Sequence, residues 1–449
     1  MKKLILFIAL LIPIGLMAQT IKIPSVKSTE LVSTVTYSDG IVITVKGANN
    51  ATTRKPLYLA AYALAHPPIV IPPTETKPVF APPAGDYIEV ALTNGKTLDL
   101  TPYSGKKIRF KSGNYSEVYI TGNKLVNIII DAGLANFDNS TVELGSGDLV
   151  EIYGLKMSNT SYRVLRFDFS LNNFHLYNST FVNCGDYALF SNNARYVTYN
   201  GTDATINKGL KLINNTFDNF GNIQLDGELN KDNGSDYGLF KDVEIAYNTF
   251  KNSSPGNAVS IGNAWNYDIH HNVVDNFNAL SNIHNGVFFM QGNGKFHDNK
   301  LTNYQGNSIR MWLFSRGKTP LTNEIYNNIC FNTRKYGGFE LQQFDRNIWG
   351  DKTTFANAKV YNNTVGQMNT NKDWEGQVLD LYDLSGTVDY YNNLGFNLNT
   401  VKYQSSVTNM INNMGNTKLT ESNNKYFPNK ADAVNDNLTS KHNGIGAVQ

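Results

Sequence analysis

Cysteine is scarce in this 449-residue chain, which contains only Cys184 and Cys330. A disulfide-rich scaffold is therefore excluded, and a chain of this length can bury enough apolar surface without covalent staples. Each cysteine lies within or directly after an apolar segment. We expect both to be small buried hydrophobic residues and not a disulfide pair.

An excess of charge of either sign is also missing. The chain has 39 Lys and Arg against 37 Asp and Glu, a formal net charge of +2, and loss of Lys2 and Lys3 with an N-terminal leader brings it to 0. Nucleic-acid binding needs a broad basic surface, so we expect no nucleic-acid partner. Positive charge gathers only in residues 306–338, where five cations face Glu324 alone, a local charge of +4. Such a patch predicts an acidic polysaccharide as partner.

Long hydrophobic runs are absent after the first eighteen residues. MKKLILFIALLIPIGLMA joins two lysines to a short apolar run and ends on Leu-Met-Ala, as a cleavable secretory signal does, so the mature chain should begin near Gln19. No cysteine marks the cleavage point for a lipoprotein anchor, and no second apolar span long enough to cross a membrane follows. We expect a secreted or periplasmic protein, monomeric, with no membrane span after signal cleavage.

Helical periodicity is missing too, and a repeated β-rich phrase takes its place. The phrase recurs every 24 to 36 residues, an interval typical of solenoids. Its copies are LYNSTF (176–181), LINNTF (212–217), IAYNTF (245–250), IHHNVV (269–274), FHDNKL (296–301), IYNNIC (325–330), VYNNTV (360–365) and YYNNLG (390–395). The fourth position is polar throughout: Ser179, Asn215, Asn248, Asn272, Asn299, Asn328, Asn363 and Asn393.

These repeats predict an all-β fold, a right-handed parallel β-helix (solenoid) with Asn-ladder turns, over residues 85–430. Asparagine tolerates left-handed backbone and bonds locally, so one per repeat suits a tight bend between strands. The remaining regions should be a signal peptide (1–18), an N-terminal extension or cap (19–65), a Pro-rich linker (66–84) and a C-terminal closing segment (431–449). The apolar ends of the phrases should stack inside the coil: Phe181, Phe217, Phe250, Val274, Leu301, Cys330 and Val365.

In these Asn-bend phrases the chain resembles the right-handed parallel β-helix superfamily that includes pectate lyases, alginate lyases and chondroitinase B. The resemblance covers roughly residues 85–430. It implies that the protein degrades a polysaccharide lying across one sheet. No catalytic residue can be carried over, because the Trp-Ile-Asp-His phrase of pectate lyases and the Asn-Thr-Asp, Asp-Asp and Gly-His-Gly signatures of polygalacturonases are absent from this sequence.

A second strand follows each Asn bend, and its outward side chains carry the candidate chemistry. With Ile223/Leu225, Val259/Ile261, Val287/Phe289, Ile309/Met311 and Phe339/Leu341 taken as inward, period two gives the outward set. This set is Gln224, Asp226, Ser260, Gly262, Phe288, Met290, Arg310, Trp312, Glu340, Gln342, Asp380 and Tyr382. Arg310 offers a fork for a carboxylate and Trp312 a flat face for a sugar ring, and the fold requires neither.

An acidic polysaccharide is cleaved by β-elimination when its uronate carboxylate is neutralised and a base and an acid are at hand. Arg310 suits the neutralising role, and His284, Tyr304 and Lys318 are the candidate bases or acids. Substrate contacts are expected from Trp312, Arg316, Glu340, Gln342, Arg334, Lys335 and Asn285. The opposing interpretation is that Arg310 only pairs with Glu340 one rung on and that the other four cations are solvated.

Other functions stay open at this point. Hydrolysis needs two carboxylates facing one bond, for which Asp226 with Glu228, or Asp380 with Asp383, are the candidates. A C5 epimerase or a non-catalytic carbohydrate-binding β-helix would also fit the repeats. No cofactor is predicted firmly. Calcium is conceivable at Asp226, Glu228, Asp232 and Asp236, and a metal at His270 and His297, although a solvated loop and a surface ladder explain these residues better.

Overall fold

The computed structural model describes residues 78–448 apart from 168–169, 193–196, 255, 279–283, 344, 373–374, 400–409 and 416, together with three short strands nearer the N-terminus. The chain divides into two compact units, Met1–Pro73 and Thr74–Gln449. In the first unit, β1 (Thr20–Lys22) pairs in parallel with β3 (Val42–Lys46), which pairs antiparallel with β2 (Val32–Thr36). The expected signal peptide and most of the Pro-rich linker lie outside the described residues.

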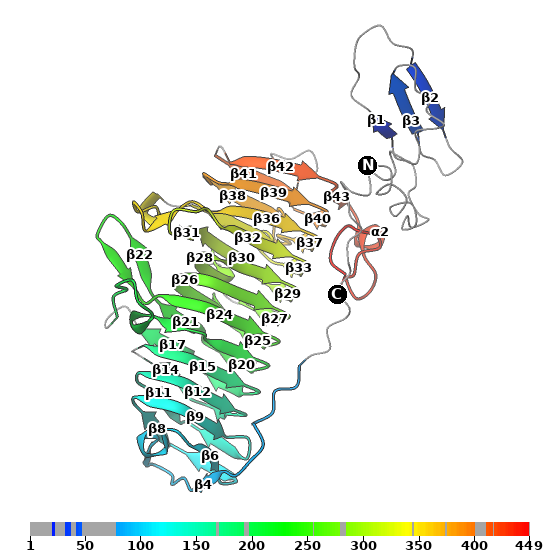
Figure 1. Ribbon diagram of the computed structural model, residues 1–449. Helices are drawn as coiled ribbons and strands as arrows, with labels where there is room; N and C mark the ends of the chain where they lie inside the picture. Colours follow the sequence, from blue (N-terminus) through cyan, green and yellow to red (C-terminus); the bar gives the residue numbers. More distant parts are fainter. Residues whose placement is uncertain are drawn as a thin grey trace, which may run out of the picture. The chain divides into compact units, whose positions relative to one another are not determined.

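Two long sheets of stacked parallel strands make up the second unit (Figure 1). The 12-stranded sheet contains β7 (Gly113–Ser116), β10 (Ala135–Asp138), β13 (Lys156–Ser158), β16 (Thr180–Cys184), β20 (Thr216–Phe220), β25 (Thr249–Ser253), β27 (Val273–Phe277), β29 (Lys300–Tyr304), β33 (Ile329–Thr333), β37 (Thr364–Met368), β40 (Leu394–Leu398) and β43 (Lys425–Phe427). Each strand pairs with the equivalent strand one repeat away.

The 24-stranded sheet holds the other strands of each repeat. It contains β4 (Ile88–Val90), β5 (Thr97–Asp99), β6 (Lys107–Phe110), β8 (Tyr119–Gly122), β9 (Leu125–Asp131), β11 (Thr141–Leu144), β12 (Gly147–Tyr153), β14 (Arg163–Phe167), β15 (Leu171–Tyr177), β17 (Tyr187–Asn192), β18 (Asn207–Lys208), β19 (Lys211–Ile213), β21 (Ile223–Asp226), β24 (Phe240–Ala246), β26 (Val259–His270), β28 (Gly286–His297), β30 (Asn307–Leu313), β32 (Thr322–Tyr326), β34 (Phe339–Gln342), β36 (Asn357–Tyr361), β38 (Leu379–Tyr382), β39 (Thr387–Tyr391), β41 (Ile411–Met414) and β42 (Lys418–Ser422).

Short elements decorate the loops between these strands. Two antiparallel pairs, β22 (Glu228–Asn230) with β23 (Ser235–Tyr237) and β31 (Ser315–Arg316) with β35 (Thr353–Thr354), project from the same side of the stack (Figure 1). The helical turns are η2 (Thr101–Tyr103), η4 (Asp203–Thr205), η5 (Asp345–Asn347) and α2 (Lys430–Ala433). The expected all-β class is confirmed, and the stacked parallel strands are compatible with a β-helix. Among the described residues, no helix is both long and apolar enough to cross a bilayer.

Hydrogen bonds join the repeated asparagines from one repeat to the next. The side-chain amide of Asn272 donates to Asn299 Oδ1 (2.9 Å), and that of Asn299 donates to Asn328 Oδ1 (3.1 Å). Asn215, Asn248, Asn363, Asn393 and Asn424 extend the same chain of bonds. The left-handed backbone expected of these asparagines belongs instead to the residue before each one, which includes Tyr247 and His271 (φ 58° and 53°). The asparagine side chain, not its backbone, is therefore what the bend requires.

Aromatic rings stack inside the coil where the phrases end. Phe181, Phe217 and Phe250 lie with ring centroids 5.0 and 5.1 Å apart and nearly parallel planes. Val274, Leu301, Cys330 and Val365 continue the row in register, all buried. The two cysteines are unpaired and buried, as expected, and burial raises the pKa of each thiol to about 12.

The predicted inward face of β28 is wrong by one residue. Phe288 and Met290 point inward, in register with Ile309 and Met311, whereas Phe289 lies beside Arg310. The run Val287–Met290 is apolar at every position, so alternation carries no information about which side chains face the core. Partner strands set the register here instead.

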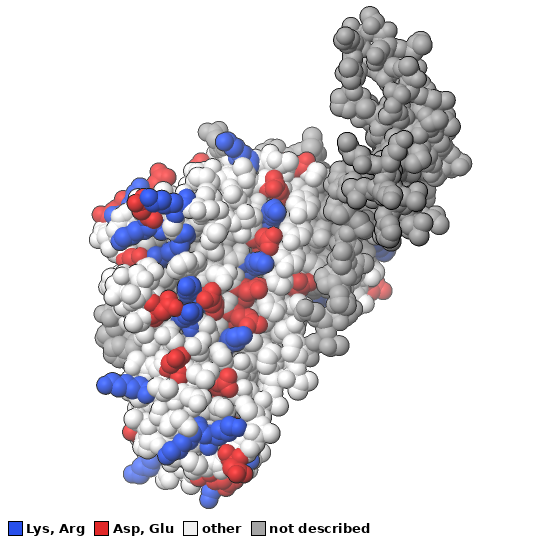
Figure 2. Space-filling model, in the orientation of Figure 1, with Lys and Arg blue, Asp and Glu red and all other residues white. Residues whose placement is uncertain are grey.

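Charged side chains form a column along one outer face of the 24-stranded sheet (Figure 2). In register from strand to strand, the column contains Lys211, Glu244, Asp268, Lys295, Glu324, Lys359 and Asp389. Opposite charges are neighbours at nearly every step, and Lys211 with Glu244 (2.8 Å) and Lys295 with Glu324 (3.5 Å) form ion pairs.

Candidate functional site

A row of polar side chains crosses four neighbouring strands of the 24-stranded sheet. Arg310 on β30 is in register with Glu340 on β34, Asp380 on β38 and Asn412 on β41. Parallel strands lie about 4.8 Å apart, so these side chains are neighbours although some thirty residues separate them along the chain. We call these four residues the polar row. The outward positions predicted for Arg310, Glu340 and Asp380 place them together as expected.

Glu340 is the carboxylate around which the site is organised. Its Oε1 lies 2.5 Å from Arg310 Nε, its Oε2 lies 2.8 Å from His284 Nε2, and the Gln342 side-chain amide also donates to Oε1. The Glu340 side chain is only 1% exposed, whereas those of Arg310 and His284 remain 20% and 30% exposed. A buried carboxylate thus lies between a guanidinium and an imidazole that solvent still reaches.

The neighbours of His284 determine which ring nitrogen carries the proton. Its Nε2 lies beside two acceptors, Glu340 Oε2 and Asn307 Oδ1, the latter at 3.1 Å. Nε2 must therefore donate, and in the neutral ring the lone pair is on Nδ1. The ring also stacks on Tyr336, with centroids 4.1 Å apart and planes 11° from parallel. The contacts of Nε2 and the stacking on Tyr336 together fix the orientation of the ring.

Two protonated groups lie beside Glu340. Burial raises the pKa of Asp380 well above its ordinary value, and the charges of Glu340 and Glu375 raise it further. Burial also raises the pKa of Tyr382, and Asp380 and Glu340 add to that effect. Both shifts favour the protonated forms, a carboxylic acid at Asp380 and a phenol at Tyr382. Tyr382, in register with Gln342 and partly exposed, is the more accessible proton donor.

The raised pKa of Asp380 makes stability depend on pH. A carboxyl whose pKa is higher in the folded than in the unfolded chain binds its proton more tightly when folded, so its contribution to stability falls as pH rises above about 4. Asp380→Asn keeps the shape and removes this proton. We expect its unfolding free energy, from urea titration, to gain on that of the wild type between pH 5 and pH 8. A difference between the two proteins that does not change with pH would contradict a protonated Asp380.

Aromatic side chains flank the polar row on the N-terminal side. Trp312 lies beside Phe289 in an edge-to-face contact (5.2 Å), and the Arg346 guanidinium lies 4.9 Å from the centre of the Trp312 ring. Trp312 is in register with Gln342. The amphipathic indole thus lies at the site, as predicted, but its face is shared with Arg346.

Several predicted site residues have other roles. Tyr304 is wrong as a base or acid, because it ends β29 inside the core with its hydroxyl 2.5 Å from Ser308 Oγ. The Lys318 side chain is 71% exposed and pairs with Asp351 at 2.9 Å, so it is a solvated loop cation. Asn285 is buried and bonds to Asn278, which gives it a structural role at the corner.

The remaining cations of residues 306–338 are also engaged away from the polar row. Arg334 donates to the Asn278 carbonyl and to Gln305 Oε1, and Lys335 lies 5.5 Å from the Tyr336 ring. Arg316 is buried and forms a two-bond ion pair with Asp236 (2.9 Å each). The opposing interpretation was therefore right about the Arg310–Glu340 pair and wrong about Arg316.

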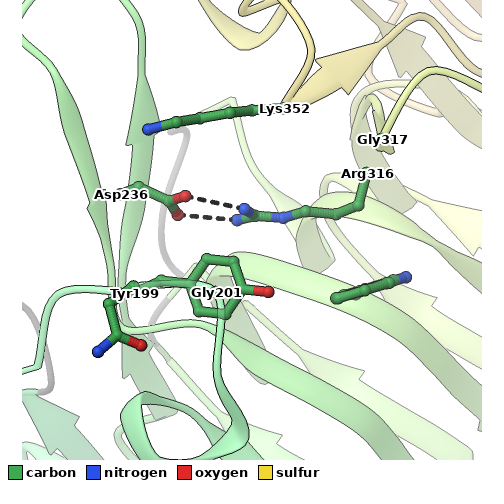
Figure 3. Close-up of a pocket in the computed structure, with 8 residues that line it drawn as sticks. Tyr199, Gly201, Asp236, Arg316, Gly317 and Lys352 are labelled. Atoms are coloured by element: carbon green, nitrogen blue, oxygen red, sulfur yellow. Dashed lines mark hydrogen bonds and ion pairs between the residues drawn. The ribbon is translucent and has the colours of Figure 1, made fainter.

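A pocket of about 390 Å³ lies among the loops near Arg316 (Figure 3). Its lining consists of Tyr199, Asn200, Gly201, Asp236, Trp265, Arg316, Gly317 and Lys352. In Figure 3 Arg316 and Asp236 reach each other across it, with Lys352 on one side and Tyr199 on the other. The sequence did not predict this pocket because its walls come from five segments that are not adjacent in the chain.

The residues considered as possible metal ligands do not form a common site. Among the described residues, no three His, Cys, Asp or Glu side chains gather as a metal centre. Asp226 accepts from Gln224, Glu228 from Tyr237, and Asp236 binds Arg316, so the possible calcium ligands bind separate partners. His270 and His297 stack on each other and continue into Tyr326 and Tyr361, as the surface-ladder interpretation predicts.

The carboxylate pairs proposed for hydrolysis do not face one bond. Asp380 is buried whereas Asp383 is exposed beyond the end of β38. Asp226 bonds to Gln224, while Glu228 lies in the hairpin and bonds to Tyr237. Glu375, which contributes to the raised pKa of Asp380, was not predicted; it precedes β38 in a loop with no periodic pattern.

Comparisons with protein-family models, with curated proteins and with solved structures found no match for this chain. The chemistry of the polar row must therefore be argued from its own geometry.

Proposed function

We propose that this protein is an exported polysaccharide lyase that cleaves a uronic-acid-containing polysaccharide by β-elimination, on the frame of a right-handed parallel β-helix. One observation carries the proposal: Arg310 and His284, from different repeats, bind opposite oxygens of the Glu340 carboxylate while both remain partly exposed. Alginate-like polymers are the first substrates to test. An acidic polymer fits because the partly exposed Arg310 guanidinium can bind its carboxylate.

Arg310 would bind the carboxylate of the sugar unit to be cleaved. Its Nε–H is engaged by Glu340, and a guanidinium has four further N–H donors on its terminal amino groups. Those donors can form two parallel bonds with a carboxylate. Neutralising that carboxylate acidifies the neighbouring C5–H, which is the bond that β-elimination breaks first.

His284 and Tyr382 would exchange the protons. Nδ1 of His284 takes the C5 proton, the released electron pair forms a C4–C5 double bond, and the C4–O glycosidic bond breaks. The Tyr382 hydroxyl gives its proton to the departing oxygen. The imidazolium then returns a proton to the phenolate through solvent, so no water is consumed and the site is restored.

Glu340 is a positioning residue in this scheme. Its charge lies 2.8 Å from His284 Nε2 and favours the Nε2–H form, whose hydrogen bond goes to Asn307 Oδ1 and which leaves Nδ1 basic. Its opposite oxygen anchors Arg310. The raised pKa of Asp380 serves the same end, because it favours the uncharged acid. A second charged carboxylate beside Glu340 would repel the substrate carboxylate from Arg310.

The product distinguishes this reaction from its alternatives. We expect the protein without residues 1–18 to release unsaturated uronate, measured by ultraviolet absorbance, from at least one of alginate, polygalacturonate, hyaluronan and chondroitin. Arg310→Ala should abolish that signal with an unchanged circular dichroism spectrum. New reducing ends without the chromophore would indicate a hydrolase, and changed C5 configuration without scission an epimerase. Binding without either reaction would indicate a carbohydrate-binding protein, and each of these results contradicts the lyase proposal.

A further inference from the structure

The pocket beside Arg316 has features that the fold does not need. Its lining has two cations and one carboxylate, hence a net charge of +1. The Asp236 charge is already matched by Arg316. The Lys352 ammonium lies 3.5 Å from the centre of the Trp349 ring and forms no ion pair among the described residues, so its charge can still act on a ligand. Tyr199 and Trp265 add two partly exposed aromatic side chains. Aromatic faces beside fixed polar groups and a cation are typical of sites for charged sugars.

The ion pair that forms one wall is held rigidly. Arg316 Nη1 and Nη2 donate to both oxygens of Asp236, and Nη2 also donates to Asn263 Oδ1 at 2.7 Å. The Arg316 side chain is only 4% exposed. Its Nε–H nevertheless has no hydrogen-bond partner among the described residues. A buried donor without a partner is costly in the empty protein, and a ligand acceptor would remove that cost.

Backbone bonds also pre-form the pocket. Tyr199 N donates to the Asp236 carbonyl, and Gly317 N donates to the Lys352 carbonyl, both at 2.7 Å. The Arg316 guanidinium carbon lies 5.4 Å from the centre of the Tyr199 ring. The loops are thus tied to each other before any ligand arrives, which lowers the entropy cost of binding.

The pocket lies a short way along the chain from the polar row. Arg316 follows Arg310 by six residues. At about 3.3 Å per extended residue, the two Cα atoms are at most about 20 Å apart. One oligosaccharide of several units can span that distance. The aromatic ring of Trp312 lies between them in the sequence, on β30.

We propose that this pocket is a second binding site for the acidic polysaccharide and holds one uronate unit away from the point of cleavage. Lys352 contacts the carboxylate of that unit, and Tyr199 and Trp265 contact its ring. The inference rests on the proposed function for the identity of the polymer, but it concerns binding alone. It can therefore be tested where no cleavage occurs.

The experiment measures binding of uronate trisaccharides by isothermal titration calorimetry in an Arg310→Ala background, which keeps the ligand intact. Trisaccharides of mannuronate, guluronate and galacturonate are compared with neutral mannotriose. We expect at least one uronate trisaccharide to bind, and Lys352→Ala and Tyr199→Ala each to weaken its affinity at least tenfold. Lys111→Ala, an exposed lysine on an early repeat, should leave the affinity unchanged.

Three results would overturn the pocket proposal. They are no uronate binding at millimolar concentration, equal binding of mannotriose, and unchanged affinity in both pocket variants. Failure of the lyase proposal has a different signature, because wild-type protein would then bind the uronate trisaccharide through the pocket without releasing unsaturated product from any polymer. Circular dichroism melting of each variant identifies a loss of affinity that comes from unfolding.

Discussion

Glu340→Gln is expected to lower kcat for release of unsaturated uronate by at least about 100-fold, which is the usual contribution of a general base in its correct state. A glutamine side chain has one acceptor oxygen and one amide nitrogen. It cannot accept from Arg310 and from His284 at once, so either the guanidinium loses its anchor or Nε2 of the imidazole faces a second donor. In the latter case the basic lone pair moves to the wrong nitrogen.

Two measurements separate positioning by Glu340 from a purely structural effect. Glu340→Gln should lose kcat while its circular dichroism melting temperature stays that of the wild type, whereas a merely unstable variant would melt at a lower temperature. Glu324→Gln is the matched control, since Glu324 pairs with Lys295 on the outer charged column. Normal kcat in Glu340→Gln would remove Glu340 from the mechanism.

Asn299→Ala is expected to lower the free energy of unfolding by about 3 to 5 kcal/mol, measured by urea denaturation, because each buried polar group that loses its partner costs about 1 to 3 kcal/mol. The Asn299 side chain donates to the Ile269 carbonyl and to Asn328, and it accepts from the backbone and side chain of Asn272. Alanine removes all four bonds and supplies no replacement in a fully buried position.

Asn303→Gly is the control for this substitution, in the same repeat. Asn303 is exposed and donates to Asp275, and its backbone has a positive φ of 53°, which glycine adopts without strain. We expect a loss below about 1 kcal/mol there, as is usual for exposed polar side chains. Similar losses in both variants would mean that the row of buried asparagines contributes no special stability.

The repeat could be predicted from the sequence because every repeat must satisfy the same hydrogen-bonding requirement. Each repeat must place a side-chain amide where the next repeat offers an acceptor, so Asn recurs at Asn272, Asn299 and Asn328. The inward phenylalanines were predictable for the same reason, since each ring packs on the ring one coil away.

The site was predicted only on strands where apolar and polar residues alternate, because the alternation shows which side chains face outward. Arg310 and Glu340 belong to strands with clear period two, and both were placed correctly. Tyr304 was misplaced because a strand-end tyrosine faces the core or solvent according to packing that period two does not encode. The pocket around Arg316 is formed by segments that the stacked strands bring together from distant parts of the chain. No local sequence pattern indicates which of these segments will be neighbours.

The charged column on the outer face limits how such a chain can grow by duplication. Lys295 lies between Asp268 and Glu324, and each of the three belongs to a different coil. Loss of the coil that carries Lys295 would bring two carboxylates face to face, which is destabilising for directly opposed like charges. Loss of that coil together with the next would place Asp268 beside Lys359 and restore an opposite pair. At the repeat that carries Lys295, loss of two repeats therefore keeps opposite charges opposed, whereas loss of that one repeat does not.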